Sequence, residues 1–442
     1  MKKIIISIIV IIVVFTIAAF IGYKMYVYNT KKVTRTETVK EVNNMPSDNE
    51  IFFDDSSEVN STSQWRGVNR DGIYNETGLL KEWPADGPEL LWFCEELGDG
   101  YSSPAIANGK IYIAGLFNDD LVLSVFDLSG KLLIKKIVGK EWNDSYPGAR
   151  STINVNEGKL YIFNSLGNLH CLDEKTFDLI WKKDVLKDFD GINIMWGMTE
   201  APLIVGDKVF ITPGGEKYNV LALNKNTGDL IWYSEGEGTT SAYCSPLFID
   251  GYSTPIIVTN TEKHVIAFNA DTGEKLWSHP QTNTYNIHPN TPIYSDGMVL
   301  SITGYGGGAV LLRLKDDGKS IEQVWVNKEI DNQKGGAVKV GDYIYASGHN
   351  NKYWFCVDWK TGETMYKAKE IYPCNVIFAD GMLYCYSERG IVAFVKPNPQ
   401  KFEMVSSFKI TMGTSQHWAH PVIHDGVLYI RHGDVLMAYK IK

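Results

Sequence analysis

The feature that most constrains this sequence is an internal repeat, which runs from about residue 100 to the end of the chain. Several copies share a tryptophan near their end, and successive ones are 45 to 51 residues apart: Trp181, Trp232, Trp277 and Trp325. Trp92 holds the same position ahead of the first copy, and the average spacing is about 47 residues. This is close to the length of one four-stranded blade of a β-propeller. Residues 63–442 have room for about eight such copies.

Each copy has the pattern of four antiparallel strands. It opens with a stretch such as 103–113, where Asn108-Gly109 predicts a tight turn between two runs of β-branched and aromatic residues. It closes with a stretch such as 265–277, where Asn-x-x-Thr-Gly turns the third strand into the fourth. In weaker copies the closing tryptophan is replaced by Ile134, Tyr366 or Val405. The predicted fold class is all-β, an eight-bladed β-propeller of four-stranded antiparallel blades.

The ends of the chain predict how the ring closes. The eighth copy runs from His420 to Ile441 and stops where its third strand should end, so it lacks a fourth strand. A strand at 89–93 has no partner in its own part of the sequence, because it precedes the first copy. Pairing the two would complete the eighth blade and remove exposed strand edges. We therefore expect an N-terminal strand to close the ring.

The first 63 residues lack the repeat. Residues 4–23 carry no charge and are long enough to cross a ~30 Å hydrocarbon layer as a helix. Residues 1–23 are therefore expected to be a membrane anchor, with a signal sequence as the alternative. Residues 24–63 are polar and predict a tether. Because long domains are translocated largely regardless of loop charge, the propeller at 64–442 is expected outside the cytoplasm, in the periplasm or at the cell surface.

Composition narrows the partners. The chain has 43 Lys and Arg against 52 Asp and Glu, a formal net charge of −9, which argues against nucleic-acid binding. The six cysteines form no C-x-x-C motif, so zinc-ribbon, thioredoxin-like and c-haem sites are not indicated. Cys374 and Cys385 lie in one copy, and their pairing stays open because spacing does not fix the Cα separation that a disulfide needs.

Two copies follow the motif Ala-x-Asp-x-x-Thr-Gly-x-x-x-Trp, at 222–232 and 267–277, with Asn224 and Asn269 in place of the Asp. The chain thereby resembles the pyrroloquinoline-quinone (PQQ) type repeat family over about residues 63–442. The leader Trp-Arg-Gly-Val-Asn-Arg-Asp-Gly at 65–72 also looks like the stretch before the first blade in many proteins with this repeat. The resemblance implies the fold, but not one activity. The family includes quinoprotein dehydrogenases and non-enzymatic scaffolds such as the outer-membrane assembly lipoprotein.

In a propeller the first strand of each blade lines the central channel, so the residues just before it gather at one mouth. This places the following candidate ligand-binding residues together: Tyr101, Ser102, Arg150, Ser151, Trp196, Glu200, Tyr243, His288, Asn290, Lys334, Asn375, His417 and His420. The set is polar and aromatic with few carboxylates, which suits a planar or hydroxyl-rich ligand or an extended peptide. The alternative is that these side chains satisfy backbone groups and pack blade against blade.

Catalysis by a bound quinone would need a carboxylate beside a calcium ion held by channel-facing oxygen ligands. Only Glu200 and Asp331 lie in suitable segments. The adjacent cysteines of the family's alcohol dehydrogenases are also missing. His417 and His420 enter a strand instead of a helix, which disfavours a zinc site. No catalytic residue, metal or cofactor is therefore predicted, with PQQ and calcium as the alternative.

The sequence thus predicts a membrane-anchored, extracytoplasmic propeller that binds a small ligand or an envelope protein across its channel mouth. Two alternatives stay open. One is a PQQ-dependent oxidoreductase acting on alcohols or sugars, and the other is a scaffold in envelope assembly.

Overall fold

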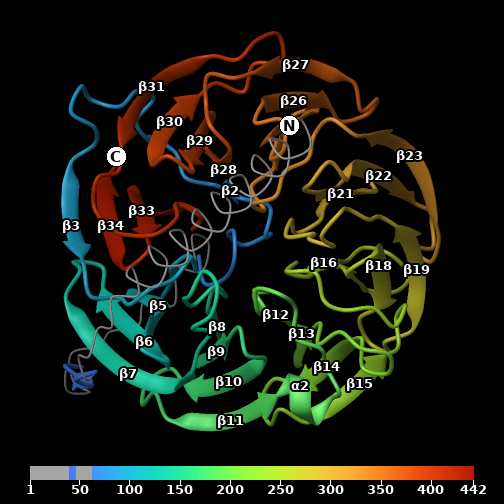
Figure 1. Ribbon diagram of the computed structural model, residues 1–442, viewed down its shortest axis with the longest axis horizontal. Helices are drawn as coiled ribbons and strands as arrows, with labels where there is room; N and C mark the ends of the chain where they lie inside the picture. Colours follow the sequence, from blue (N-terminus) through green and yellow to red (C-terminus); the bar gives the residue numbers. More distant parts are fainter. Residues whose placement is uncertain (1–38, 46–61) are drawn as a thin grey trace, which may run out of the picture. The chain divides into compact units, whose positions relative to one another are not determined.

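The computed structural model describes residues 39–45 and 62–442. Its strands form eight four-stranded antiparallel sheets, arranged in a ring within the unit formed by residues 40–442 (Figure 1). In the described residues the one helix is the short α2 (Val185–Asp188). The predicted all-β propeller with eight blades is confirmed. The predicted anchor at 1–23 lies outside the described residues, and no helix within them is long and apolar enough to cross a membrane.

The first four blades follow one another along the chain. Blade 1 consists of β4 (Ala105–Ala107), β5 (Lys110–Phe117), β6 (Asp120–Asp127) and β7 (Leu132–Lys140). Blade 2 consists of β8 (Asn154–Asn156), β9 (Lys159–Phe163), β10 (Asn168–Asp173) and β11 (Leu179–Asp184). Blade 3 consists of β12 (Leu203–Val205), β13 (Lys208–Ile211), β14 (Val220–Asn224) and β15 (Leu230–Ser234). Blade 4 consists of β16 (Leu247–Ile249), β17 (Ile256–Asn260), β18 (His264–Asn269) and β19 (Lys275–Pro280).

The remaining blades continue in the same order, except for the last. Blade 5 consists of β20 (Ile293–Ser295), β21 (Met298–Thr303), β22 (Gly308–Leu314) and β23 (Ile321–Asn327). Blade 6 consists of β24 (Val338–Val340), β25 (Tyr343–Ser347), β26 (Trp354–Asp358) and β27 (Thr364–Ala368). Blade 7 consists of β28 (Cys374–Ala379), β29 (Met382–Ser387), β30 (Ile391–Val395) and β31 (Met404–Lys409). Blade 8 consists of β32 (Val422–His424), β33 (Val427–His432), β34 (Val435–Lys440) and β3 (Leu90–Cys94).

In each blade the first strand faces the channel and the fourth forms the outer wall (Figure 1). Two short strands from the N-terminal part add to this plan. β1 (Val42–Asn43), which lies within the predicted tether, pairs antiparallel with the outer strand β7. β2 (Ile73–Tyr74) pairs parallel with the inner strand β28. The N-terminal segments therefore reach both the outer and the inner edge of the ring.

The apolar core lies between neighbouring blades. Leu221 and Leu223 of blade 3, for example, pack in one buried cluster with Tyr161 and Phe163 of blade 2. The cluster at the closure joins blades 7, 8 and 1 with side chains from residues 74–97. Burial of apolar surface between blades is thus what favours the ring over separate sheets.

At several interfaces the closing tryptophan of one blade docks on the third turn of the next, whereas the buried indole N–H of Trp277 has no hydrogen-bond partner among the described residues. The indole Nε1 of Trp232 donates to the carbonyl of Ala270 over 3.0 Å, and that of Trp325 donates to Trp359 over 2.9 Å. The glycine of the Thr-Gly turn lies against the ring: a Cβ on Gly273 would be 2.5 Å from Trp232. Glycine is therefore required here for two reasons. Its φ of 76° disfavours other residues, and the indole leaves no room for a side chain.

One interface has exchanged both partners. In blade 1, Ile134 holds the tryptophan position opposite Val125. In blade 2, Phe177 stands at the glycine position, with a φ of 60° and its side chain buried in the same cluster as Ile134. A smaller residue on one side is matched by a larger one on the other, so the volume between the blades stays filled.

The seventh blade corrects one expectation from the sequence. We expected Val405 at its tryptophan position, but Ser406 stands there, opposite Phe394. The space is taken by Trp83 from the segment before β3. Its ring stacks on Phe394 with centroids 3.7 Å apart, and its backbone N–H donates to Ser406 Oγ over 2.7 Å. The connection between β30 and β31, residues 396–403, lacks the Asn-x-x-Thr-Gly turn of copies such as 269–273, so the sequence does not fix which residue of β31 takes the tryptophan position.

Blade 8 takes its outer strand from the N-terminal side of the ring. β3 pairs antiparallel with β34, with Trp92 opposite Ala438. Arg431 of β33, fully buried, reaches across to blade 1. Its guanidinium donates to the carbonyls of Ala114 and Gly98 over 2.7 and 3.1 Å. The junction between the last and first blades is thus held by strand pairing and by a buried cation.

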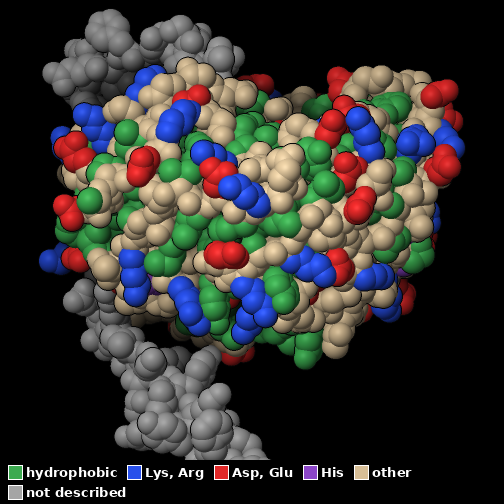
Figure 2. Space-filling model, turned by 90° about the horizontal axis from the view of Figure 1, so that it is seen from above, with side chains coloured by type: hydrophobic (Ala, Val, Ile, Leu, Met, Phe, Trp, Pro, Cys, Tyr) green, Lys and Arg blue, Asp and Glu red, His purple; other side chains and the backbone are tan. Residues whose placement is uncertain are grey.

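The outer wall carries charges of both signs in alternation. Figure 2 shows Lys and Arg side chains interspersed with Asp and Glu on the face in view. Such mixing keeps a surface soluble without giving it a field of one sign. The view agrees with the modest net charge and gives no support to an electrostatic binding patch on this face.

All six cysteines fall in the described residues, and all are free thiols. Cys374 and Cys385 lie on the adjacent strands β28 and β29, where Cys385 pairs with Val376 and Cys374 pairs with Ser387. The two thiols therefore sit diagonally across the strand pair, and the structure does not join them.

The docking of indole on glycine yields a stability prediction. Gly273→Ala should lower the free energy of unfolding by about 2 to 4 kcal/mol, because it adds a clash with Trp232 to the strain of a positive φ. Gly381→Ala is the matched control: its φ of 79° is similar, but a Cβ there would meet nothing within 4 Å. It should lose only about 1 to 2 kcal/mol. Equal losses in urea unfolding would show that the indole contact contributes nothing.

Candidate binding site at the channel mouth

The channel is filled by the chain's own leader, residues 62–74. Thr62 bridges to Ile106 of blade 1, and the carbonyl of Ser63 accepts from the N–H of Val155 in blade 2 over 2.8 Å. The indole N–H of Trp65 donates to Thr291 Oγ1, just before blade 5, over 3.0 Å. At its end the leader becomes β2, which lies on blade 7. A segment that looked like a polar approach to the first blade thus runs through the axis of the ring.

Two buried arginines fasten the leader to the remaining blades. Arg66 donates to the carbonyls of Gly335 and Ala337, before blade 6, over 2.7 and 2.6 Å. Arg70 donates to Pro202 over 2.5 Å and to Pro246 over 3.1 Å, at the starts of blades 3 and 4. Burial lowers the pKa of Arg66 to about 10 and of Arg70 to about 9, so both stay cationic at neutral pH.

The residues predicted to line the mouth form two layers. The lower layer is buried and consists of Ser102, Ser151, Glu200, His288, Asn290, Asn375 and His420. The upper layer contains the side chains nearer to solvent: Tyr101, Arg150, Trp196, Tyr243, Lys334 and His417. The sequence placed all of them just before the inner strands, and they lie there except for Asn375, which is within β28. It did not show at which depth each side chain lies.

The lower layer links one blade to the next through side-chain hydrogen bonds. Ser151 Oγ donates to the carbonyl of Glu200 over 2.8 Å. Asn290 Nδ2 donates to Asn332 over 2.8 Å, and Asn375 Nδ2 donates to Trp418 over 2.6 Å. Ser102 Oγ accepts from Arg431 over 2.6 Å. These groups satisfy backbone carbonyls at the inner ends of the blades, as the structural alternative predicted for this set.

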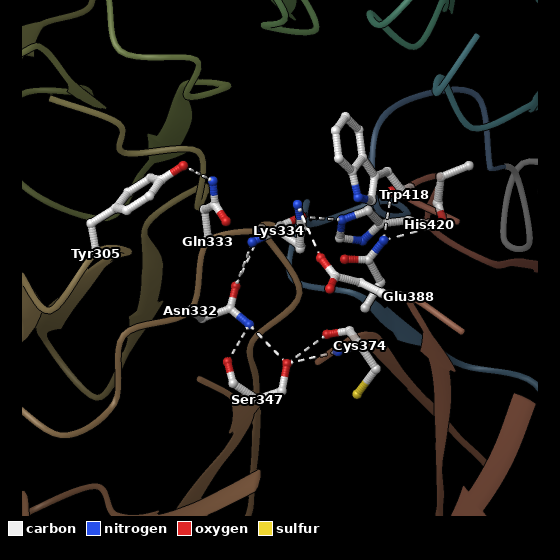
Figure 3. Close-up of polar contacts among 12 residues, drawn as sticks. Tyr305, Asn332, Gln333, Lys334, Ser347, Cys374, Glu388, Trp418 and His420 are labelled. Carbon is white, nitrogen blue, oxygen red and sulfur yellow. Dashed lines mark hydrogen bonds and ion pairs between the residues drawn. The ribbon is translucent and has the colours of Figure 1, made fainter. Parts of the chain in front are cut away.

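Lys334 and Trp418 form the best-defined element of the upper layer. Figure 3 shows the Lys334 side chain beside Trp418 and Glu388. Its Nζ lies 4.1 Å from the centroid of the indole and 3.1 Å from Glu388 Oε1. Burial lowers the pKa of Lys334, while Glu388 acts to raise it. The lysine is thus held over an aromatic face by a carboxylate.

Tyrosines surround this pair. The rings of Tyr101 and Tyr146 lie 5.0 and 5.1 Å from Trp418. On other blades, Tyr285 lies 4.7 Å from Tyr305. Tyr146 and Tyr285 keep 44% and 55% of their surface exposed. Such rings offer apolar faces together with hydroxyl groups that can bond a partner.

The other predicted residues of the upper layer also contact aromatic rings or carbonyls. Trp196 and Tyr243 have ring centroids 6.2 Å apart. Arg150 donates to the carbonyls of Ser145 and Tyr146, and burial lowers its pKa. His417 is stacked on His432 at 3.6 Å, and burial lowers its pKa to about 4. At neutral pH His417 is therefore uncharged, and the cations of this layer are Arg150 and Lys334.

Sequence reasoning missed Tyr146, Tyr285, Tyr305, Glu388 and Trp418. Tyr305 and Glu388 belong to the turns between the second and third strands, which meet the same mouth as the connections between blades. Tyr146 and Tyr285 stand in long connections whose course the repeat does not fix. No sequence signal marked them, because the connections at 141–153 and 281–292 hold aromatic residues at about the average frequency of the chain.

The side chains present do not fit a calcium-bound quinone. Asp331 accepts three backbone N–H groups, from Gly306, His349 and Asn350, over 2.9 to 3.1 Å. Burial raises the pKa of Glu200 to about 8, so it is mainly a neutral acid at pH 7. In the described residues no three His, Cys, Asp or Glu side chains converge as metal ligands do. Glu200 Oε1 likewise accepts from the N–H of Thr212 over 2.7 Å, so both carboxylates nominated for this role already serve the fold.

Comparisons with known proteins agree with the fold. A family model described as "Outer membrane protein assembly factor BamB" matches residues 122–248 and 239–401, more than half of the chain. The chain therefore belongs to this family of PQQ-type propellers.

Two curated proteins are similar in sequence. BamB of Shewanella oneidensis is 26% identical over 254 residues, which are 52% of this chain and 59% of that protein. Quinoprotein ethanol dehydrogenase of Pseudomonas aeruginosa is 28% identical over 151 residues, 30% of this chain and 23% of that protein. This chain thus spans less than two thirds of either relative. The crystal structure of BamB from Moraxella catarrhalis has a TM-score of 0.61 at 15% identity, covering 80% of this chain and 100% of that one.

The buried Glu200 yields a prediction of pH dependence. Its pKa is raised from 4.5 to about 8 on folding, mainly by burial, so the native state binds this proton more tightly than the unfolded chain. Stability from this group is present at low pH and is lost as pH rises toward 8. Relative to Glu200→Gln, the wild type should therefore lose up to about 1.4 kcal/mol per pH unit between pH 6.5 and 8.

The measurement is urea unfolding of both proteins across this pH range. Glu157→Gln is the control, because Glu157 is exposed and Lys225 lowers its pKa. A wild type and a Glu200→Gln variant with parallel stability curves would show that Glu200 is ionised when folded.

Proposed function

We propose that this protein is a non-catalytic binding module of the cell envelope, and that it docks a protein partner on the upper layer of the channel mouth. The observation that carries the proposal is the composition of that layer, in which tyrosine, tryptophan and two cations surround an axis already filled by the leader. Residues of these types dominate the binding energy of protein interfaces.

The geometry favours a surface contact over a ligand inside the ring. Leader side chains bond groups on the inner ends of the blades, so the channel below the mouth is occupied. Exposed rings such as Tyr146 and Tyr285 remain above it. Tyrosine and tryptophan lose little conformational freedom on binding, which makes them effective in a shallow site.

The relatives support a role in the envelope. The family model and the Shewanella oneidensis relative both carry the description outer membrane protein assembly factor. The apolar segment 4–23 would keep the chain at a membrane, with the propeller in the periplasm or at the cell surface. The quinoprotein relative favours the competing function, an oxidoreductase, but Glu200 and Asp331 do not offer the ligands that its cofactor would need.

Site-specific photocrosslinking in intact cells tests the docking surface. A photoreactive residue in place of Tyr285 should give a protein adduct of discrete mass, because this ring is exposed at the mouth. The matched control is Tyr233, which is 41% exposed on the outer strand β15 and should give no such adduct. Adducts from Tyr233 but not from Tyr285 would place the docking surface on the outer wall and refute the proposal.

The crosslinked partner, once purified, allows an affinity measurement. Trp196→Ala should weaken binding about ten- to a hundredfold, because truncating an aromatic anchor removes about 1 to 3 kcal/mol. Tyr233→Ala should leave the dissociation constant unchanged. Equal affinities of the Trp196→Ala variant and the wild type, with thermal unfolding unaltered, would show that the partner does not bind at the Trp196 side of the mouth.

A further inference from the structure

A chain of contacts through Arg66 connects the leader to the upper layer of the mouth, and the ring of Trp65 also packs edge-on against His420 at 4.5 Å. Arg66 Nη1 lies 3.1 Å from His420 Nδ1, and His420 Nε2 lies 2.8 Å from the carbonyl oxygen of Lys334. A carbonyl only accepts, so Nε2 carries the proton and Nδ1 accepts from the guanidinium. Burial and Arg66 lower the pKa of His420 to about 3, which keeps this tautomer neutral. His420 thus relays the position of Arg66 to the backbone of Lys334.

The seat of Arg66 is shaped for a guanidinium group. Its two terminal nitrogens reach the carbonyls of Asp71, Gly335 and Ala337 as well as His420. Gly72 makes the room, because a Cβ there would lie 2.4 Å from Arg66 Nη2. A lysine has the charge but a single nitrogen, so it cannot hold all of these acceptors at once.

The segment that receives this contact carries the recognition element. Asn332 Oδ1 accepts from the N–H groups of Lys334, Gly335 and Gly336, which fixes the turn from the side of blade 6. Figure 3 shows Asn332 below Lys334 and His420 beside it. Arg66 and His420 hold the same turn from the channel. The Lys334 side chain then lies over Trp418, which contacts Tyr101.

Arg70 provides an internal comparison. It is as deeply buried as Arg66, and it also bonds backbone carbonyls, those of Ala201, Pro202 and Pro246. Apart from one bond of each within the leader, to Gln64 and to Asp71, the bonds of Arg70 end on blades 3 and 4 and those of Arg66 end before blade 6 and on His420. Loss of either guanidinium should weaken the ring, but only Arg66 is linked to Lys334 and Trp418.

We propose that Arg66 is a positioning residue for the mouth: through His420 it sets the Lys334–Trp418 pair in the geometry that receives the partner. The inference rests on the proposed function for its consequence, a binding affinity. The placement of Trp418 by Arg66 can be tested whether or not a partner binds. The mouth therefore binds its partner only when the leader occupies the channel.

The test compares Arg66→Lys with Arg70→Lys in the full chain labelled with 5-fluorotryptophan. Trp418→Phe identifies the fluorine resonance of Trp418. We expect Arg66→Lys to shift or broaden this resonance and Arg70→Lys to leave it in place, while both lower the melting temperature. His420→Gln removes the imidazole that connects Arg66 to Lys334. It should shift the Trp418 resonance, and it provides the test if Arg66→Lys does not fold.

Affinity for the crosslinked partner gives the second readout. Arg66→Lys and His420→Gln should each weaken binding about tenfold, and Arg70→Lys should leave it within about twofold. A Trp418 resonance that stays in place in His420→Gln, or that moves equally in Arg66→Lys and Arg70→Lys, would overturn the positioning role. A displaced resonance in a protein that binds no partner at the mouth would refute the proposed function and leave the positioning role standing.

Discussion

A buried guanidinium group must find hydrogen-bond acceptors for its N–H donors, and three such groups tie the leader and the closing blade of this protein to the rest of the ring. Arg66, Arg70 and Arg431 are almost fully buried, and their bonds end mainly on backbone carbonyls. For Arg66 and Arg70 most of those carbonyls stand just before the inner strands, where the sheet ladder no longer supplies partners, whereas Arg431 bonds Gly98 and Ala114 across the junction of blades 8 and 1. The arginines therefore satisfy groups that the ring would otherwise leave unpaired.

The docking of tryptophan on the turn of the next blade supplies the other half of the architecture. It sets the spacing between neighbouring sheets, and so the width of the channel that the leader fills. Ile134 stands in place of a tryptophan, and Phe177 stands in place of a glycine on the facing blade. The combined volume of the two facing residues therefore matters more to the interface than their identity. With the axis filled, a partner can meet the aromatic and cationic groups of the mouth only from outside the ring, which is why the proposed function is placed there.

The fold could be predicted from the repeat because the period of the closing tryptophans, the turn residues and the missing eighth strand all indicate the same ring. The pairing of β3 with β34 follows from that missing strand. Ser406 in place of Val405 could not be predicted, since the connection at 396–403 lacks the Thr-Gly turn by which the other copies are aligned. The leader was also missed: two arginines in a polar stretch normally lie in solvent, and only the assembled ring creates acceptors for them. At the mouth, position along the chain was predictable. How deeply each side chain is buried was not predictable, because neighbouring residues have different partners. Tyr101 bonds Gln416, whereas Ser102 bonds the buried Arg431.

The central claim is that the ring is built around its own leader, and amide hydrogen exchange of the full chain tests it most directly. The N–H groups of Ile106, Val155 and Phe378 donate to leader carbonyls, and that of Thr62 donates to Ile106. We expect these four amides to exchange as slowly as those in the middle strands of the blades. Rapid exchange of these four amides, with the middle strands still protected, would show that the leader does not occupy the channel and would contradict the account.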